Sequence, residues 1–361
     1  MNTKVDYSFS FAPPHRITLS RPQASMKTLA DITPESLQLS WSYQSLAEMP
    51  VNIWHVPPVS WGLRATLFLN GEPMTFSSWK RPENKLPGLY LQAERNGVFC
   101  NICGMAAETG DVFKITWQNT GAEPITAEVS VEHNVGGWVI SNPAWIDGNH
   151  PNSLLTMEDE RADRVLAVGV GADEYPISLS DETRSEIVVP MPNGTASKAG
   201  NPAKTMTMRL HLVAGESKTE WLVRPYEAYE ADITSLQGKD WGKELSAAIG
   251  EWQSWLSRSA EPIIPDKGVS DAFYACLADL FVMQERDSAG HIVTSCGTCC
   301  YRSTNASEPT LVCTVIDQLG YEQEALQEQP VHIEAQGDDG NWSDPKGWTH
   351  HTWGPPDLRR A

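Results

Sequence analysis

The sequence predicts a multidomain α+β protein in which a large antiparallel β-sandwich precedes a helical region. Apolar and polar residues alternate over residues 5–229, and the apolar spacing then changes to every third or fourth position. The chain has 361 residues, and at roughly 100–200 residues per domain this length predicts two domains. Hydrophobic residues make up 40% of the chain, which is enough to build packed cores.

The strands are predicted from alternating segments that end in turn residues. Residues 112–117 and 125–131 both alternate, and the turn at 119–121 between them predicts a hairpin. Further strands are expected at residues 97–103, 165–170, 185–189, 206–213 and 218–223. Because a single sheet of this size leaves one face uncovered, these strands predict two sheets packed as a sandwich.

Four helices are predicted after residue 229. Residues 241–259 carry one apolar stripe, formed by Leu245, Ala248, Ile249, Trp252, Trp255 and Leu256. The second helix is expected at 270–286 with Ser270 as its N-cap, and the third at 307–319 with Gly320 ending it. The fourth is expected at 321–336, broken or kinked by Pro330.

The charge balance excludes two classes of partner. Twenty-seven basic residues against 46 acidic ones give a net charge of −19, which repels nucleic acid and anionic membrane surfaces. No segment approaches the ~20 apolar residues of a membrane-spanning helix, and residues 1–11 do not resemble a secretion signal. We therefore expect a soluble protein of the cytoplasm that binds neither nucleic acid nor membranes.

The cysteines and tryptophans fit a reduced protein without a metal site. Cys100 with Cys103 and Cys296 with Cys299 form two C-x-x-C pairs, but about 190 residues separate the pairs, against ~15–20 in a zinc site. We expect no metal and no cofactor. Cys100 and Cys103 are expected to fill space on a strand, and Cys276 and Cys313 on helices. The 14 Trp are either core residues or flat platforms for sugar rings.

Short motifs recur in order from the end of the sandwich onward. A turn at 212–216 precedes Trp221-Leu222-Val223-Arg224-Pro225, and Trp252 and Trp255 lie on the next helix. The later motifs are Pro265-Asp266, the segment 272–280, Tyr301-Arg302, Glu308, Val315-Ile316-Asp317, Leu319-Gly320-Tyr321, Glu324-Ala325 and the segment 336–342. In this order they resemble the N-terminal part of bacterial six-hairpin glycoside hydrolases, the glucoamylase-like type in which a β-super-sandwich precedes an (α/α)6 barrel.

The resemblance implies three parts. Residues 1–230 are expected to form the sandwich, 231–265 a linker helix and 266–361 the first hairpins of the barrel. Twelve helices of ordinary length need well over roughly 250 residues, so an incomplete (α/α)6 toroid is expected and the chain is expected to be a fragment. Helices without neighbours would expose apolar surface, which predicts self-association through the open barrel.

The resemblance also selects candidate site residues. Glycoside hydrolysis requires two carboxyl groups, and the candidates are Glu308, Asp338 and Asp339. Glu308 alternatively completes a helix cap, and the two aspartates alternatively are solvated turn residues. Substrate contacts are expected from Tyr301, Arg302, Trp342 and Trp348, where the Arg either holds a carboxylate-bearing sugar or pairs with Asp317 or Glu308. In similar enzymes the general acid commonly lies on later hairpins.

The expected function is hydrolysis of an oligosaccharide or polysaccharide by carboxylate acid/base catalysis. Whether this chain, with its incomplete barrel, is itself active is left open. The alternatives are a sugar phosphorylase or a polysaccharide lyase of the same architecture, and a non-catalytic carbohydrate-binding or assembly module.

Overall fold

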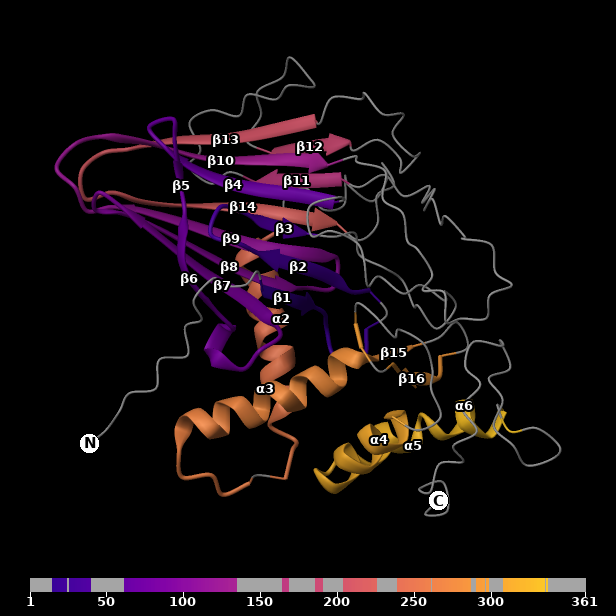
Figure 1. Cartoon of the computed structure of the whole chain (residues 1–361). Helices are drawn as coiled ribbons and strands as arrows, with labels where there is room; N and C mark the ends of the chain where they lie inside the picture. Colours follow the sequence, from indigo (N-terminus) through magenta and orange to yellow (C-terminus); the bar gives the residue numbers. More distant parts are fainter. Residues whose placement is uncertain are drawn as a thin grey trace, which may run out of the picture.

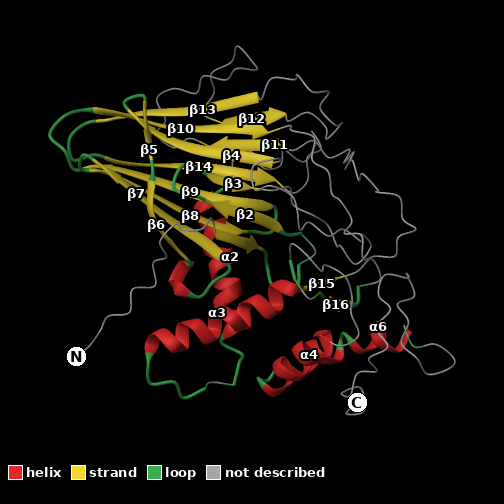
Figure 2. Cartoon of the chain, viewed as in Figure 1, coloured by secondary structure: helices red, strands yellow, loops and turns green. Residues whose placement is uncertain are grey.

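The structure is a computed structural model that describes much of the sandwich and of the helical region. The described residues are 15–24, 26–39, 62–134, 164–168, 186–190, 204–225, 239–260, 262–286, 290–295, 297–298, 308–334 and 336. Most strands precede the helices along the chain, and one short hairpin lies between the helices, so the predicted α+β order is confirmed. Figure 2 shows the strands in yellow and the helices in red. No helix within these ranges combines the length and apolar character needed to cross a membrane.

The described strands form two large antiparallel sheets (Figure 1). The first sheet has the order β1 (His15–Leu19), β2 (Thr28–Ile32), β3 (Leu37–Leu39), β4 (Gly62–Leu69), β10 (Ile125–Asn134) and β13 (Lys204–Leu212), with β5 (Glu72–Met74) paired to β4. The second has the order β12 (Glu186–Pro190), β11 (Arg164–Val168), β14 (Ser217–Pro225), β9 (Gly110–Asn119), β8 (Val98–Ala106), β7 (Gly88–Arg95) and β6 (Phe76–Lys80).

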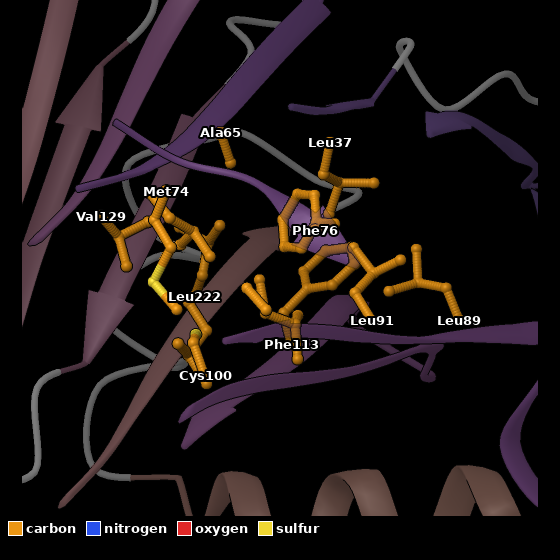
Figure 3. Packing of buried hydrophobic residues seen from close by; sticks show 14 of the residues in the cluster. Leu37, Ala65, Met74, Phe76, Leu89, Leu91, Cys100, Phe113, Val129 and Leu222 are labelled. Atoms are coloured by element: carbon orange, nitrogen blue, oxygen red, sulfur yellow. The ribbon is translucent and has the colours of Figure 1, made fainter. Parts of the chain in front are cut away.

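A hydrophobic core fills the space between the sheets, as the alternating sequence predicts. Along β8 the side chains of Val98, Cys100 and Ile102 point into this core, whereas Cys103 and Met105 point to the opposite face. Figure 3 shows side chains from both sheets meeting in the core, among them Leu37, Ala65 and Val129 from the first sheet and Leu91, Phe113 and Leu222 from the second. The two-sheet sandwich is therefore confirmed.

The predicted hairpin between residues 112–117 and 125–131 is wrong, although both segments are strands. β9 pairs with β8 and β14, and β10 pairs with β4 and β13, so the chain crosses from one sheet to the other. The side chain of Asn119 bridges this crossing, because its Nδ2 donates to the carbonyls of Glu123 at 2.8 Å and Leu212 at 3.3 Å. Alternation of apolar and polar residues shows only which face of a strand is buried. Pairing with a strand of either sheet would bury that face equally well.

The helix α2 (Trp241–Leu256) covers the outer face of the second sheet and confirms the helix predicted at 241–259. Its buried residues Trp241, Leu245, Ala248 and Trp252 share a second core with Met105, Val112 and Val223 of the sheet. The six tryptophans in the described ranges all pack in the two cores: Trp79 and Trp117 between the sheets, and Trp221, Trp241, Trp252 and Trp255 beneath the helices. Trp79, Trp117, Trp241 and Trp252 are buried core residues, and Trp221 and Trp255 are partly buried against the second core.

The helix α3 (Lys267–Met283) differs from its prediction at both ends. It begins three residues earlier than expected, because Asp266 and not Ser270 caps it, accepting from the N–H of Gly268 at 2.8 Å and Val269 at 3.0 Å. After Met283 the chain extends into β15 (Gln284–Arg286), which pairs with β16 (Ile292–Thr294). This small hairpin was predicted as the end of a helix.

The remaining described helices are α4 (Glu308–Gln318), α5 (Glu322–Leu326) and α6 (Gln329–Glu334). Gly320, with φ +92°, ends α4 as predicted. The segment predicted as one helix is broken before Pro330, which occupies the first turn of α6. In Figure 1, α3 lies between the strands and these three helices. The Tyr321 hydroxyl donates to the carbonyl of Trp255 at 2.8 Å and so joins the α4–α5 turn to α2.

Candidate functional site

The candidate catalytic and substrate-binding residues lie mostly outside the described part of the chain. Glu308 is the first residue of α4, and its backbone is described while its side chain is not. Tyr301, Arg302, Asp338, Asp339, Trp342 and Trp348 lie outside the described residues. The structure therefore does not test whether these seven side chains come together.

The described residues that precede Tyr301 and Arg302 in the sequence contact the sandwich and α3. The hydroxyl of Thr298 lies 2.6 Å from the hydroxyl of Thr18 on β1. Ser295 follows β16, and its hydroxyl donates to the carbonyl of Met283 at 3.0 Å. The β15–β16 hairpin thus joins the sandwich, α3 and the chain that leads toward Tyr301 and Arg302.

A buried carboxylate, Glu328, holds this hairpin against α4. Glu328 is fully buried between α5 and α6. Its Oε1 accepts from the N–H of Thr294 at 3.1 Å, and its Oε2 accepts from the hydroxyl of Thr294 at 2.6 Å and the thiol of Cys313 at 2.7 Å. All three groups act as donors, so the carboxylate fixes the relative positions of β16 and α4.

The same polar network continues into the sandwich. The side chain of Gln284 donates to the hydroxyl of Thr294 at 3.3 Å and accepts from Gln23 Nε2 at 2.8 Å. Gln23 lies in the β1–β2 loop with φ +54°, and its N–H donates to the carbonyl of Phe281 at 3.2 Å. The left-handed backbone of a buried Gln is costly, and the surrounding hydrogen bonds hold it in place.

Three cysteines of the described residues, Cys100, Cys103 and Cys313, have thiols that burial keeps protonated. Burial, reinforced by the charge of Glu328, raises the pKa of the Cys313 thiol far above its usual range. Burial also raises the pKa of Cys100 and of Cys103, so all three remain protonated thiols near neutral pH. The filler role is confirmed for the buried Cys100 and Cys313.

The prediction for Cys276 is wrong. This residue is exposed on α3, because the buried face of that helix passes instead through Leu277, Ala278 and Phe281. Within the described ranges, no three His, Cys, Asp or Glu side chains form a group that could hold a metal ion.

A pocket of about 340 Å³ lies where the sandwich meets the β15–β16 hairpin. It is lined by the β1–β2 loop, the β8–β9 turn and β15, through Arg21, Pro22, Gln23, Ala24, Met26, Ala107, Glu108 and Arg286. Its walls combine apolar surface with two guanidinium groups and one carboxylate. Such a mixture suits a small ligand that carries both polar groups and apolar faces.

The two arginines of this pocket differ in their partners. Arg21 makes a bidentate ion pair with Glu251 of α2, both contacts being 2.8 Å. Arg286 donates to two neutral oxygens, the carbonyl of Gly290 and Oε1 of Gln23, both at 3.3 Å. Within the described residues, Arg286 therefore keeps a positive charge that no carboxylate neutralises.

Glu328, Gln23 and Arg286 carry no sequence signal that marks them as part of a site. Glu328 falls in the helix predicted at 321–336, just before the break or kink expected at Pro330, and Arg286 falls at the end of another predicted helix, where charged residues normally face solvent. The burial of Glu328 depends on Thr294, which is 34 positions away in the sequence. No local pattern marks such a partner.

Comparisons with known proteins give distant structural similarities only. No protein-family model matches the chain, and no curated protein matches it. A bacterial glucoamylase solved with acarbose is 10% identical, with a TM-score of 0.49 over 94% of this chain and 54% of that structure. A family GH92 inverting mannosidase from Bacteroides thetaiotaomicron VPI-5482 is 14% identical, with a TM-score of 0.41 over 91% of this chain and 46% of that structure. The chain thus spans about half the length of these structures, and similarities this distant assign no substrate or reaction to it.

Proposed function

We propose that the protein is a carbohydrate-active enzyme, a glycoside hydrolase of the six-hairpin type. In this proposal residues 1–230 form the sandwich, 231–265 contain the linker helix and 266–361 supply the first hairpins of an (α/α)6 barrel. The main support for this proposal is the packing of α2 on the outer face of the second sheet. Residues of α3 and of the α4–α5 turn pack in the same core. This order and packing fit the resemblance in the sequence motifs.

The proposed chemistry uses carboxyl groups near the ends of the helices. Glu308 begins α4, where the helix dipole favours a negative charge, and Asp338 and Asp339 follow α6 in the sequence. One carboxyl group protonates the leaving oxygen, and the other acts as nucleophile or activates water. Tyr301, Arg302, Trp342 and Trp348 are the proposed substrate contacts.

The buried network assists this chemistry by holding α4 in place. Glu328 joins β16 to Cys313, which lies five positions after Glu308 on the same helix. A carboxyl group at the start of α4 therefore belongs to a helix that is held rigidly against the hairpin. Rigid support of this kind preserves the separation between paired catalytic groups.

The proposal is tested by incubating the purified chain with a panel of aryl glycosides. Turnover of any member that Glu308→Gln or Asp338→Asn abolishes, while an exposed control such as Glu94→Gln retains it, supports the hydrolase. Release of product that requires phosphate identifies a phosphorylase, and an unsaturated product identifies a lyase. Glycan binding without turnover supports the carbohydrate-binding module, and absence of both contradicts a carbohydrate function.

A further inference from the structure

We infer that the pocket between the β1–β2 loop and the β15–β16 hairpin binds a sugar acid of the hexuronate class. The inference rests on the proposed carbohydrate function and names one chemical class of glycan residue that the protein recognises. The described lining of the pocket consists of residues outside the set proposed for catalysis. Binding to the pocket can be measured independently of catalysis.

The cation in this pocket is Arg286. Its contacts within the described chain are two long hydrogen bonds of 3.3 Å to neutral oxygens, and its side chain is exposed. Among the described residues no carboxylate pairs with this arginine, in a protein whose net charge is −19. A guanidinium group of this kind is suited to bidentate binding of a ligand carboxylate.

The charge balance of the walls favours a ligand with one negative charge and several hydroxyl groups. Arg21 and Glu251 neutralise each other, which leaves the positive charge of Arg286 and the negative charge of Glu108. A carboxylate near Arg286 and hydroxyl groups near Glu108 match this arrangement, because Glu108 accepts hydrogen bonds but repels a second anionic group. A hexuronate carries one carboxylate and a ring of hydroxyl groups, whereas phosphate carries up to two charges and no apolar face.

The size and rigidity of the pocket agree with a single sugar ring. Its volume of about 340 Å³ is near the lower limit for small-molecule sites. Pro22, Ala24, Met26 and Ala107 supply the apolar surface on which the C–H face of a sugar packs.

Hydrogen bonds hold the β1–β2 loop, which forms one wall of the pocket, against the end of α3 and β15. Lys27 Nζ donates to the carbonyls of Ala24 at 2.9 Å, Val282 at 2.5 Å and Gln284 at 3.0 Å. Gln23 is fixed by Phe281 and Gln284. A preformed wall of this kind reduces the entropic cost of binding.

The direct test is calorimetric titration of the full chain with glucuronate, glucose, acetate and inorganic phosphate. Glucuronate is expected to bind one site with a dissociation constant of about 1 mM or tighter, and at least about tenfold more tightly than glucose. Arg286→Gln is expected to weaken glucuronate binding by at least about tenfold, because it removes the charge-assisted contacts. Arg95→Gln, which makes the same charge change at the β7–β8 end of the sandwich, is expected to leave binding unchanged.

A second variant separates a sugar-acid site from a simple anion site without relying on Arg286. Glu108→Ala is expected to weaken glucuronate binding and to strengthen acetate and phosphate binding, since it removes both a hydroxyl acceptor and a repulsive charge. Glu94→Ala is the matched control on an exposed position of β7. Thermal melts of each variant verify folding.

Equal affinities for glucuronate and glucose, tighter binding of phosphate than of glucuronate, or unchanged binding in folded Arg286→Gln would overturn the inference. An inactive protein that still binds glucuronate contradicts only the hydrolase proposal. An active hydrolase that does not bind glucuronate contradicts only this inference.

Discussion

Glu328 joins β16 to α4 through buried hydrogen bonds to Thr294 and Cys313. Replacing it with Ala leaves the donors of Thr294 and Cys313 without an acceptor in a fully buried place and also opens a cavity. We expect Glu328→Ala to lower the free energy of unfolding by about 3 kcal/mol or more. Glu328→Gln keeps the volume and one acceptor, so a loss of about 1–2 kcal/mol is expected.

Urea denaturation of both variants measures these losses. The matched control is Glu322→Gln on exposed helical surface, which is expected to change stability by less than about 0.5 kcal/mol. A Glu328→Ala variant as stable as the wild type would show that the network does not hold the junction together.

Tyr321 links stability to pH in the alkaline range. Burial raises the pKa of its phenol from 10.0 to about 12, so the folded protein prefers the neutral form. The stabilisation from this preference is fully present below pH 10 and is lost as the pH rises from 10 toward 12. At neutral pH, Tyr321→Phe is expected to cost about 1 kcal/mol, because the hydrogen bond to Trp255 is lost.

The difference in the free energy of unfolding between the wild type and Tyr321→Phe should shrink as the pH is raised from 10 to 12. Only the wild type has a phenol at this position whose deprotonation destabilises the folded state. Chemical denaturation of both proteins at pH 8 and pH 11, together with the ultraviolet titration of tyrosinate, tests the prediction. A difference between the two proteins that stays constant with pH would mean that Tyr321 ionises as readily in the folded chain as in the unfolded one.

At the scale of elements, Gly88 is required where β7 begins beside β8. A Cβ atom at this position would meet the carbonyl oxygen of Gly104 at 2.6 Å and the sulfur of Met105, so backbone atoms would have to move. We expect Gly88→Ala to lower the free energy of unfolding by about 3 kcal/mol. Gly250, inside α2, has open space around it, and Gly250→Ala is expected to stabilise the protein by about 0.5–1 kcal/mol.

Thermal and chemical denaturation of the two glycine variants check the opposite signs. A Gly88→Ala variant as stable as the wild type would contradict the close approach of β7 and β8, and a destabilised Gly250→Ala would contradict the open space around Gly250.

Helices and strands that depend on a local pattern of apolar residues were predicted correctly. Features that depend on pairing with a segment distant in the sequence were missed. The apolar stripe from Leu245 to Leu256 predicts α2, and alternation predicts the strands around Cys100 and Phe113. The crossing at Asn119 was missed, because alternation does not distinguish a partner in one sheet from a partner in the other. The β15–β16 hairpin was missed because apolar residues of α3 continue to Met283 and suggest a longer helix.

The candidate site was less predictable than the fold. Motif resemblance selected Glu308, Asp338 and their neighbours, which remain predictions. The pocket is formed by Arg21, Glu108 and Arg286, which come from three distant segments, and neither their charges nor their spacing indicates that they meet. Proximity of this kind arises from the fold and not from the local sequence.

The helices α4, α5 and α6 expose apolar side chains on the surface of the molecule. Leu311 is 61% exposed and Val315 43% on one face of α4, and Leu326 and Ile333 are 57% and 66% exposed on α5 and α6. Such surfaces favour association. We expect the weight-average mass in sedimentation experiments to rise above 39.9 kDa with concentration.

The double variant Leu311→Ser/Val315→Ser should reduce this association, whereas Val213→Ser, at an exposed position after β13, should not. A monodisperse monomer from micromolar to near-millimolar concentration would contradict self-association through these helices.

The proposal that this sandwich and its helices form part of a glycoside hydrolase is best tested by the initial rate of 4-nitrophenol release from a panel of 4-nitrophenyl glycosides. We expect measurable release from at least one glycoside and a loss of at least about 100-fold in Glu308→Gln with the fold intact. No release from any glycoside, or an equal rate in the wild type and in Glu308→Gln, would contradict the proposal.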